Sequence, residues 1–303
     1  MTTPPVHNFD ALVTRLMSTA TAPMRVAVVC PDDAATLEAL AHALSLGIIT
    51  CRLYFKGDAV LPHALRDYAA ACTLIACDDA DDAARKAVSD VRDGLADVLV
   101  KGLVNTDNLL RAVLDKQHGL LPPGGVLSHL TVMEIPDHDR LLFMSDVAVI
   151  PNPTPEQHRA MVGYLVGACR RLGIVRPRVA LIHCTEKVSP KFPVTLAYTD
   201  IVARAAAGEW GEAEIAGPMD VKTACDSHSA QVKGLTSPVC GHADAIVFPD
   251  LEAGNVFYKA MTCFAEAETA GVLVGTTAPV VVPSRSDDAK SKFASLALAC
   301  VLA

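Results

Sequence analysis

The chain has 303 residues, of which 51% are hydrophobic and 20% are charged, and its formal net charge is -8. This length favours two domains of about 150 residues each. The acidic balance argues against a nucleic-acid-binding protein, which usually has a basic patch or a high pI, although a few Arg and Lys side chains can still form a local positive pocket.

Strand-like and helix-like segments alternate along the first part of the chain. Short apolar runs predict strands at residues 24–30, 52–55, 72–76 and 96–100, and apolar residues at helical spacing predict helices at 34–48, 81–91 and 109–116. After Gly119, the segment LLPPGG is rich in Pro and Gly and marks a domain boundary.

Two strand-like runs then follow each other without a helix between them. Residues 126–135 and 140–150 are separated by PDHD, which is typical of a turn, so we expect an antiparallel pair. Alternation resumes with strands at 177–184, 212–217, 243–248 and 271–283, and with helices at 154–172, at 194–207, after 248 to about 270, and from about 287 onwards.

These repeated units predict an α/β protein whose mostly parallel sheets are covered by helices on both faces. We expect two αβα sandwich domains with a cleft between them. The first comprises residues 1–123 and 284–303, because the last helix is expected to return to it, and the second comprises residues 124–283.

Hydropathy and cysteine usage predict a cytoplasmic protein. Apolar stretches such as 272–282 are short and interrupted by Gly and Pro, so no membrane span is expected. Residues 1–10 lack the basic flank and apolar run of a signal peptide. The ten cysteines have no C-x-x-C spacing, and most lie among Val, Ala and Leu, which is typical of buried free thiols.

Polar residues follow the predicted strands at four places, where ligands bind in such folds. At the first, Lys101 ends a strand, and Thr106 and Arg111 lie at the start of the next helix. The pattern indicates either an anion site built from helix amides and these two basic residues, or plain helix capping by residues such as Asn105 with a surface Arg.

The other three junctions are equally open on local pattern alone. Ser128 and His129 begin one strand of the expected antiparallel pair, and Asp146 ends the other. Asn255 lies on the helix that follows the strand at 243–248. The last junction, PSRSDDAKSK, places Ser284 and Arg285 at a strand end, where the guanidinium suits phosphate oxygens, or where two Asp simply cap a helix beside a solvated Arg.

Common nucleotide and nucleophile motifs are missing from these junctions. The sequence has no G-x-G-x-x-G turn, no G-x-x-x-x-G-K-S loop and no G-x-S-x-G elbow, and its ten His show no metal-binding spacing. This argues against dehydrogenases, kinases and hydrolases that depend on those motifs.

Four segments, in the same order, resemble the phosphate acetyltransferase and phosphate butyryltransferase family. They are KGLVNTDNLLRAVL, LSHLTVMEIP…RLLFMSDVAVIPNPTPEQ, SPVCGHADAIVFPDLEAGNVFYKA and PVVVPSRSDDAKSKFASLALA. The resemblance covers about residues 96–303. It implies two αβα domains similar to isocitrate and isopropylmalate dehydrogenases, and a homodimer or higher homo-oligomer.

The resemblance also implies an activity: acyl-CoA and phosphate are interconverted with acyl phosphate and coenzyme A, without a metal or redox cofactor in the chemical step. Ser284 and Arg285 match the Ser-Arg pair of the family's active site, and Arg111 is similar to its second phosphate-binding arginine. Ser128, Asp146 and Asn255 fall on motif positions and are expected to line the cleft, and Lys101 and Thr106 are expected near phosphate or coenzyme A.

One departure concerns the base that deprotonates the coenzyme A thiol. The acetyl-specific branch has an Asp seven residues after the active Ser, whereas this chain has Ser291 there. Asp287 is a candidate base instead, and the pattern is similar to the butyryl branch. Two alternatives stay open: a metal- and nicotinamide-dependent oxidative decarboxylase on the same scaffold, and a non-catalytic coenzyme A-binding or regulatory subunit.

Overall fold

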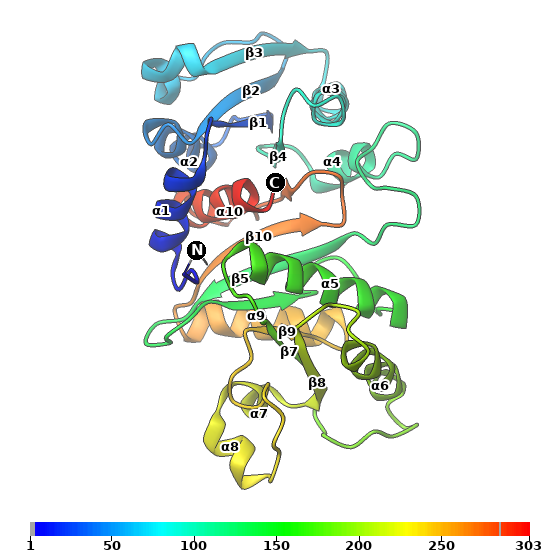
Figure 1. Cartoon of the computed structure of the whole chain (residues 1–303). Coiled ribbons are helices and arrows are strands. Elements are labelled where there is room, and N and C mark those ends of the chain that lie inside the picture. The colour runs from blue at the N-terminus through cyan, green and yellow to red at the C-terminus, as the bar shows by residue number, and fades with distance from the viewer. Residues whose placement is uncertain (1–3, 285) are drawn as a thin grey trace. The chain divides into compact units, whose positions relative to one another are not determined.

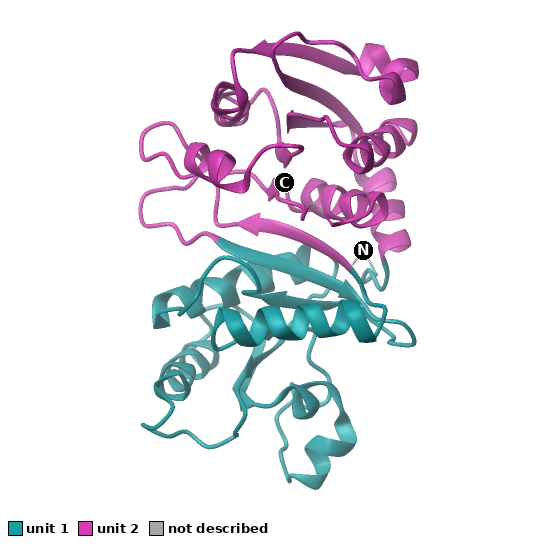
Figure 2. Ribbon diagram, turned by 180° about the vertical axis from the view of Figure 1, so that it is seen from behind, with its two compact units in different colours: residues 1–8, 128–268 teal, residues 9–127, 269–303 magenta. Residues whose placement is uncertain are grey.

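A computed structural model describes residues 4–284 and 286–303. The chain forms two compact units, and each unit is built from two segments of the sequence (Figure 2). Unit 1 contains residues up to 8 and 128–268, and unit 2 contains 9–127 and 269–303. The chain therefore returns from unit 1 to unit 2 between residues 268 and 269. This boundary is earlier than the expected one at 283–284, because the strand beginning at Glu268 pairs with the strand at 280–281.

Unit 2 is built on a sheet with the strand order β3-β2-β1-β4-β11-β10. Its strands are β1 (Met24–Val29), β2 (Ile49–Lys56), β3 (Cys72–Cys77), β4 (Val98–Lys101), β10 (Glu268–Val274) and β11 (Val280–Val281). All neighbouring pairs are parallel except β10 with β11, whose register is Leu273↔Val280. The apolar sequences of β1 and β4 fit strands that are buried on both faces.

Helices cover both faces of this sheet (Figure 1). They are α1 (Phe9–Thr19), α2 (Ala34–Ser45), the 3-10 helix η1 (His63–Ala71), α3 (Ala80–Arg92), α4 (Thr106–Val113) and α10 (Ala289–Leu302). One face carries α10 packed against α2 and α1, and the other carries α3 packed against α4. Residues 292–300 of α10 are all buried, which explains the continuous apolar run LALAC. The helices α1 and η1 were not predicted from the sequence.

Unit 1 has the strand order β5-β6-β9-β7-β8. Its strands are β5 (Ser128–Glu134), β6 (Leu142–Ser145), β7 (Arg178–Ile182), β8 (Glu214–Met219) and β9 (Ala245–Val247). The expected antiparallel pair is confirmed by the register Thr131↔Met144, and the remaining neighbours are parallel.

The helices of unit 1 lie on both faces of its sheet. They are α5 (Pro155–Arg171), α6 (Pro193–Ala206), α7 (Val221–Cys225), α8 (Ser227–Val232) and α9 (Leu251–Phe264). Thr154 and Gln157 form a capping box at the start of α5. The short helices α7 and α8 were not predicted. Within the described residues, no helix is both long and apolar enough to cross a membrane.

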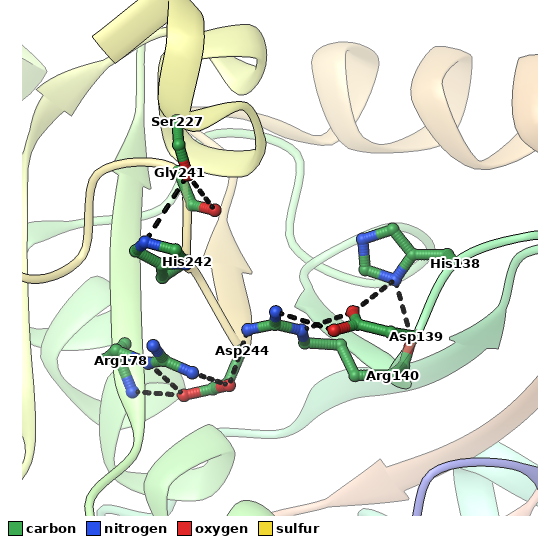
Figure 3. Close-up of polar contacts among 8 residues, drawn as sticks. All are labelled: His138, Asp139, Arg140, Arg178, Ser227, Gly241, His242 and Asp244. Carbon is green, nitrogen blue, oxygen red and sulfur yellow. Dashed lines mark hydrogen bonds and ion pairs between the residues drawn. The ribbon is translucent and has the colours of Figure 1, made fainter. Parts of the chain in front are cut away.

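A buried carboxylate ties together the amino ends of three neighbouring strands of unit 1 (Figure 3). Asp244 precedes β9, and its side chain is only 5% exposed. Its oxygens accept hydrogen bonds from the Arg178 backbone N–H (2.9 Å), Nε (3.0 Å) and Nη2 (2.9 Å). Arg140, just before β6, places its Nη1 3.9 Å from the same carboxylate. Asp244 therefore braces β6, β9 and β7 at this edge.

Asp244→Asn is expected to lower the free energy of unfolding by about 2 to 3 kcal/mol, because it leaves Arg178 without its charged, largely buried partner. Urea unfolding followed by circular dichroism measures this change. Asp200→Asn is the matched control, since the Asp200–Arg204 pair is exposed and its loss should cost less than about 0.5 kcal/mol. Equal effects of the two substitutions would contradict the brace.

Candidate active site

The carboxyl ends of β1, β4 and β11 lie side by side along one edge of the unit 2 sheet. β1 and β4 pair at Val29↔Lys101, and β4 and β11 pair at Val100↔Val281. Ligands of open parallel sheets bind at such an edge, beyond the carboxyl ends of the strands. Residues that directly follow the three strands are therefore the first candidates for a site.

Backbone hydrogen bonds join the residues that directly follow β1 and β4. Gly102 N–H donates to Val29 O (2.8 Å), and Leu103 N–H donates to Cys30 O (2.6 Å). A Cβ at position 102 would lie 2.2 Å from Cys30 O, so only glycine fits there. Lys101, which is 4% exposed, donates from Nζ to Gly102 O at 3.3 Å.

The start of α4 differs from the simple capping that its sequence allows. Asn105 occupies the N-cap position, but its side chain makes no capping hydrogen bond. Thr106 is the first helical residue and is exposed. Asn105 therefore does not cap the first amides of α4 with its side chain, and an anion site at this junction stays a prediction.

A tight turn places Ser284 and Asp287 together after β11. Asp287 Oδ2 accepts a hydrogen bond from Ser284 N–H (2.8 Å), and Asp287 N–H donates to Ser284 O (3.2 Å). Ser284 is exposed, and its Oγ lies 3.0 Å from Ser286 Oγ. Asp288, rather than Asp287, caps α10 through Ser291 N–H (2.8 Å). Arg285 lies outside the described residues.

Arg111 lies in the last turn of α4 and lines a cavity of about 520 Å³ between α3 and α4. Its side chain is 73% exposed, and its Nη1 is 3.8 Å from Asp81 Oδ2. The charged residues of the lining, His apart, are Arg85, Lys86, Arg92, Arg111, Asp81 and Asp115. Positive charges thus outnumber negative ones. Among the described residues, neither Ser284 nor Lys101 contributes to this lining.

Ser128 and Asp146 meet in a buried cluster of unit 1, and the exposed Asn255 contacts the same loop. Asp146 is 1% exposed, and its Oδ2 accepts hydrogen bonds from Ser128 Oγ (2.8 Å) and His129 N–H (2.9 Å). Its Oδ1 accepts from the backbone N–H groups of Ala148 and Val149, both at 2.8 Å. Four bonds fill the acceptor sites of a carboxylate, so Asp146 shapes the loop after β6.

The remaining member of this cluster comes from α9. Asn255 Nδ2 donates to Val147 O at 3.0 Å, and the neighbouring Gly254 brings the helix against the same loop. A Cβ on Gly254 would lie 2.1 Å from Asp146 O and 3.0 Å from a ring carbon of Phe248. The motif EAGN therefore encodes a close approach between α9 and the loop after β6.

Two further junctions carry polar groups to which the sequence analysis gave no functional weight. His183, after β7, accepts at Nδ1 from Thr185 N–H (3.2 Å), and Cys184 Sγ lies 3.7 Å from the same nitrogen. Asp32 and Asp33 follow β1, in the segment PDD that is typical of a turn and a helix start. Their position after a predicted strand was the available signal. No group of three or more His, Cys, Asp or Glu within the described part of the chain is arranged to hold a metal ion.

Comparisons with known proteins show which family the chain is similar to. The family model described as phosphate acetyl/butaryl transferase matches residues 63–300. The phosphate butyryltransferase of Clostridium acetobutylicum is 34% identical over 98% of this chain and 99% of its own length, and the phosphate acetyltransferase of Thermotoga maritima is 36% identical over 74% and 76%. The crystal structure of a branched-chain phosphotransacylase from Enterococcus faecalis V583 superposes with a TM-score of 0.82 at 28% identity, covering 92% of this chain and 98% of that one.

Gly254→Ala is expected to destabilise the protein by about 2 to 3 kcal/mol, because the added methyl group meets a backbone oxygen that cannot move freely. Thermal or urea unfolding measures the change. Gly167→Ala in α5 is the matched control: open space surrounds Gly167, so alanine should stabilise the helix by about 0.5 to 1 kcal/mol. Effects of the same sign at both positions would contradict the close approach of α9.

Proposed function

The chain belongs to the phosphate acetyl/butyryltransferase family and is a phosphate acyltransferase, and we propose that Ser284 and Arg285 form its reacting centre. Its reaction interconverts acyl-CoA and phosphate with acyl phosphate and coenzyme A. The observation that carries the proposal is the position of Ser284, exposed at the carboxyl end of β11 and next to the exit of β4. Two curated relatives that are phosphate butyryltransferases, 34% and 35% identical to this chain, support a short-chain, butyryl-type substrate.

The proposed chemistry needs two charge-stabilising groups at this edge. Arg285 binds the phosphoryl oxygens through its planar guanidinium and neutralises the leaving phosphate. Ser284 Oγ donates a hydrogen bond to the oxyanion that develops at the carbonyl or to phosphate. Coenzyme A attacks as a thiolate, and an unperturbed thiol with a pKa of about 8.5 needs only modest assistance at neutral pH. No metal or redox cofactor takes part in this scheme.

Coenzyme A itself carries phosphate groups, and unit 2 offers positive groups for them. We assign the cavity between α3 and α4 to these phosphates, because Arg111 lines it together with three more basic residues, Arg85, Lys86 and Arg92. Thr106 and the first amides of α4, which the Asn105 side chain does not cap, attract an anion through the helix dipole. Lys101 adds a positive charge at the exit of β4.

In unit 1, Asp146 acts through position rather than through chemistry. Its carboxylate holds Ser128, the backbone of His129 and the loop that Asn255 also contacts. We propose that this cluster fixes the loop after β6 within unit 1. We also propose a homodimer in the cytoplasm: α9 exposes Val256 and Phe264 on one apolar face, which supports association with a second copy.

Arg285→Ala is expected to reduce phosphate-dependent release of coenzyme A by roughly a hundredfold or more, because a charged donor to the transition state is lost. The assay uses acetyl-, propionyl-, butyryl- and longer CoA esters, which also ranks the acyl groups. Arg285→Lys keeps the charge without the planar fork and should fall between wild type and alanine. Near-normal turnover of Arg285→Ala would remove this residue from the mechanism.

Arg111→Ala is expected to raise the KM for coenzyme A by roughly tenfold to a hundredfold with little change in kcat, because charge-assisted hydrogen bonds contribute about 1.5 to 3 kcal/mol. Steady-state kinetics with varied coenzyme A measure it. Arg66→Ala removes an exposed arginine from η1 and should leave the KM unchanged. A KM effect on acyl phosphate alone would instead place Arg111 at the transferred phosphate.

A further inference from the structure

Two neighbouring carboxylates follow β1 at the edge that carries Ser284, and their surroundings differ. Asp33 caps α2 through Thr36 N–H (2.9 Å) and pairs with Lys292 Nζ at 2.6 Å. Lys292 is 8% exposed and also donates to Thr36 Oγ1 (3.0 Å). Burial raises the pKa of Asp33, but its hydrogen bonds with Lys292 and Thr36 outweigh that effect and hold the pKa below its usual value. Asp33 is thus an ionised structural residue.

Asp32 is in the opposite situation. Within the described residues its carboxylate has no hydrogen-bond or ion-pair partner, and the residue is exposed, so a ligand can reach it. Desolvation by the surrounding protein raises the pKa of Asp32, and the negative charge of Asp33 adds to the shift. Two adjacent titratable groups whose environments push their pKa values apart are typical of a site where one of them exchanges protons.

The sheet places Asp32 at a suitable distance from the reacting centre. Asp32 is the third residue after Val29 of β1, and Ser284 is the third after Val281 of β11, with β4 between the two strands. Neighbouring strands lie about 4.8 Å apart, so β1 and β11 are separated by roughly 10 Å. The reaction needs three contacts in a row: the carboxylate with the thiol, the thiol with the carbonyl carbon, and the carbonyl oxygen with Ser284 Oγ. At about 3 Å each, these contacts span a length similar to the separation of β1 and β11.

Asp287, the candidate from sequence, has one of its two carboxylate oxygens engaged within the turn after β11. Its Oδ2 accepts the hydrogen bond from Ser284 N–H that closes the turn after β11. Removing a proton from a substrate requires a carboxylate oxygen with an open acceptor site that faces the thiol. Asp32 offers both oxygens.

We propose that Asp32 is the general base that takes the proton from the coenzyme A thiol. The S–H bond breaks toward the Asp32 carboxylate, the sulfur forms a bond to the carbonyl carbon of acyl phosphate, and the C–O bond to phosphate breaks with its electron pair leaving on phosphate. In the reverse direction, protonated Asp32 returns its proton to the departing sulfur. This role rests on the acyltransferase activity proposed above and names a catalytic residue for it.

The test compares Asp32→Asn, Asp287→Asn and wild type in the direction from acyl phosphate and coenzyme A. At pH 7, Asp32→Asn should lower kcat roughly a hundredfold to ten-thousandfold with small changes in both KM values. The defect should shrink about tenfold for each pH unit as the pH rises toward the thiol pKa of about 8.5, where the thiolate forms without a base. Among the described residues, the titratable groups that act on Asp32 are Asp33, which Lys292 holds, and the thiol of Cys30, and all three residues remain in the variant.

Asp58→Asn removes an exposed carboxylate after β2 and should behave as wild type. Unfolding of Asp32→Asn should match that of wild type, because no partner of Asp32 is lost. A kcat within threefold of wild type, a slow variant with an unchanged pH profile, or the pH-dependent defect appearing in Asp287→Asn would each overturn the assignment. An inactive wild type would instead count against the acyltransferase function itself.

Discussion

The parallel pairing of β4 with β1 on one side and β11 on the other is the constraint on which the candidate site of unit 2 depends. The backbone of Leu103 bonds to Cys30 where β4 and β1 end, and the lack of space for a Cβ at Gly102 keeps the two exits close. These backbone contacts determine the positions of the side chains on the residues that follow the three strands. Chemistry at this edge can therefore vary by substitution of side chains while the geometry persists.

Carboxylates in this protein separate into two kinds by what surrounds them. Asp244 and Asp146 are buried, and each accepts several hydrogen bonds, one at the amino ends and the other at the carboxyl end of strands in unit 1. Such carboxylates fix the backbone, and their hydrogen-bond acceptor sites are occupied. Asp32 is exposed and has no hydrogen-bond or ion-pair partner for its carboxylate among the described residues. Position in a family motif alone does not distinguish a carboxylate that fixes the backbone from one that is open to a ligand. The number of hydrogen bonds that the carboxylate accepts does distinguish them.

Periodicity and turn chemistry were sufficient to predict the α/β class, the β5–β6 pair and the start of α5 at Pro155. They failed for the short α7 and α8, because one or two turns give too little periodicity to detect, and they also failed for α1, which has 11 residues. The cluster of Asp146 with Asn255 joins segments more than a hundred residues apart, a contact that no local pattern encodes. Asp32 was hidden for another reason: PDD is a common helix start, and only the absence of a partner distinguishes it from Asp33.

The ion pair between Lys292 and Asp33 joins residues that are 259 positions apart. Unit 2 also takes β10, β11 and α10 from residues 269–303, whereas the 128–268 segment of unit 1 is continuous. During translation, residues 9–127 emerge first but lack the strands and the helix that complete their sheet and cover its face. Their folding cannot be completed until the ribosome has made unit 1 and the segment after it, and apolar surface stays exposed until then. Chaperone dependence should therefore fall on the N-terminal part of the nascent chain.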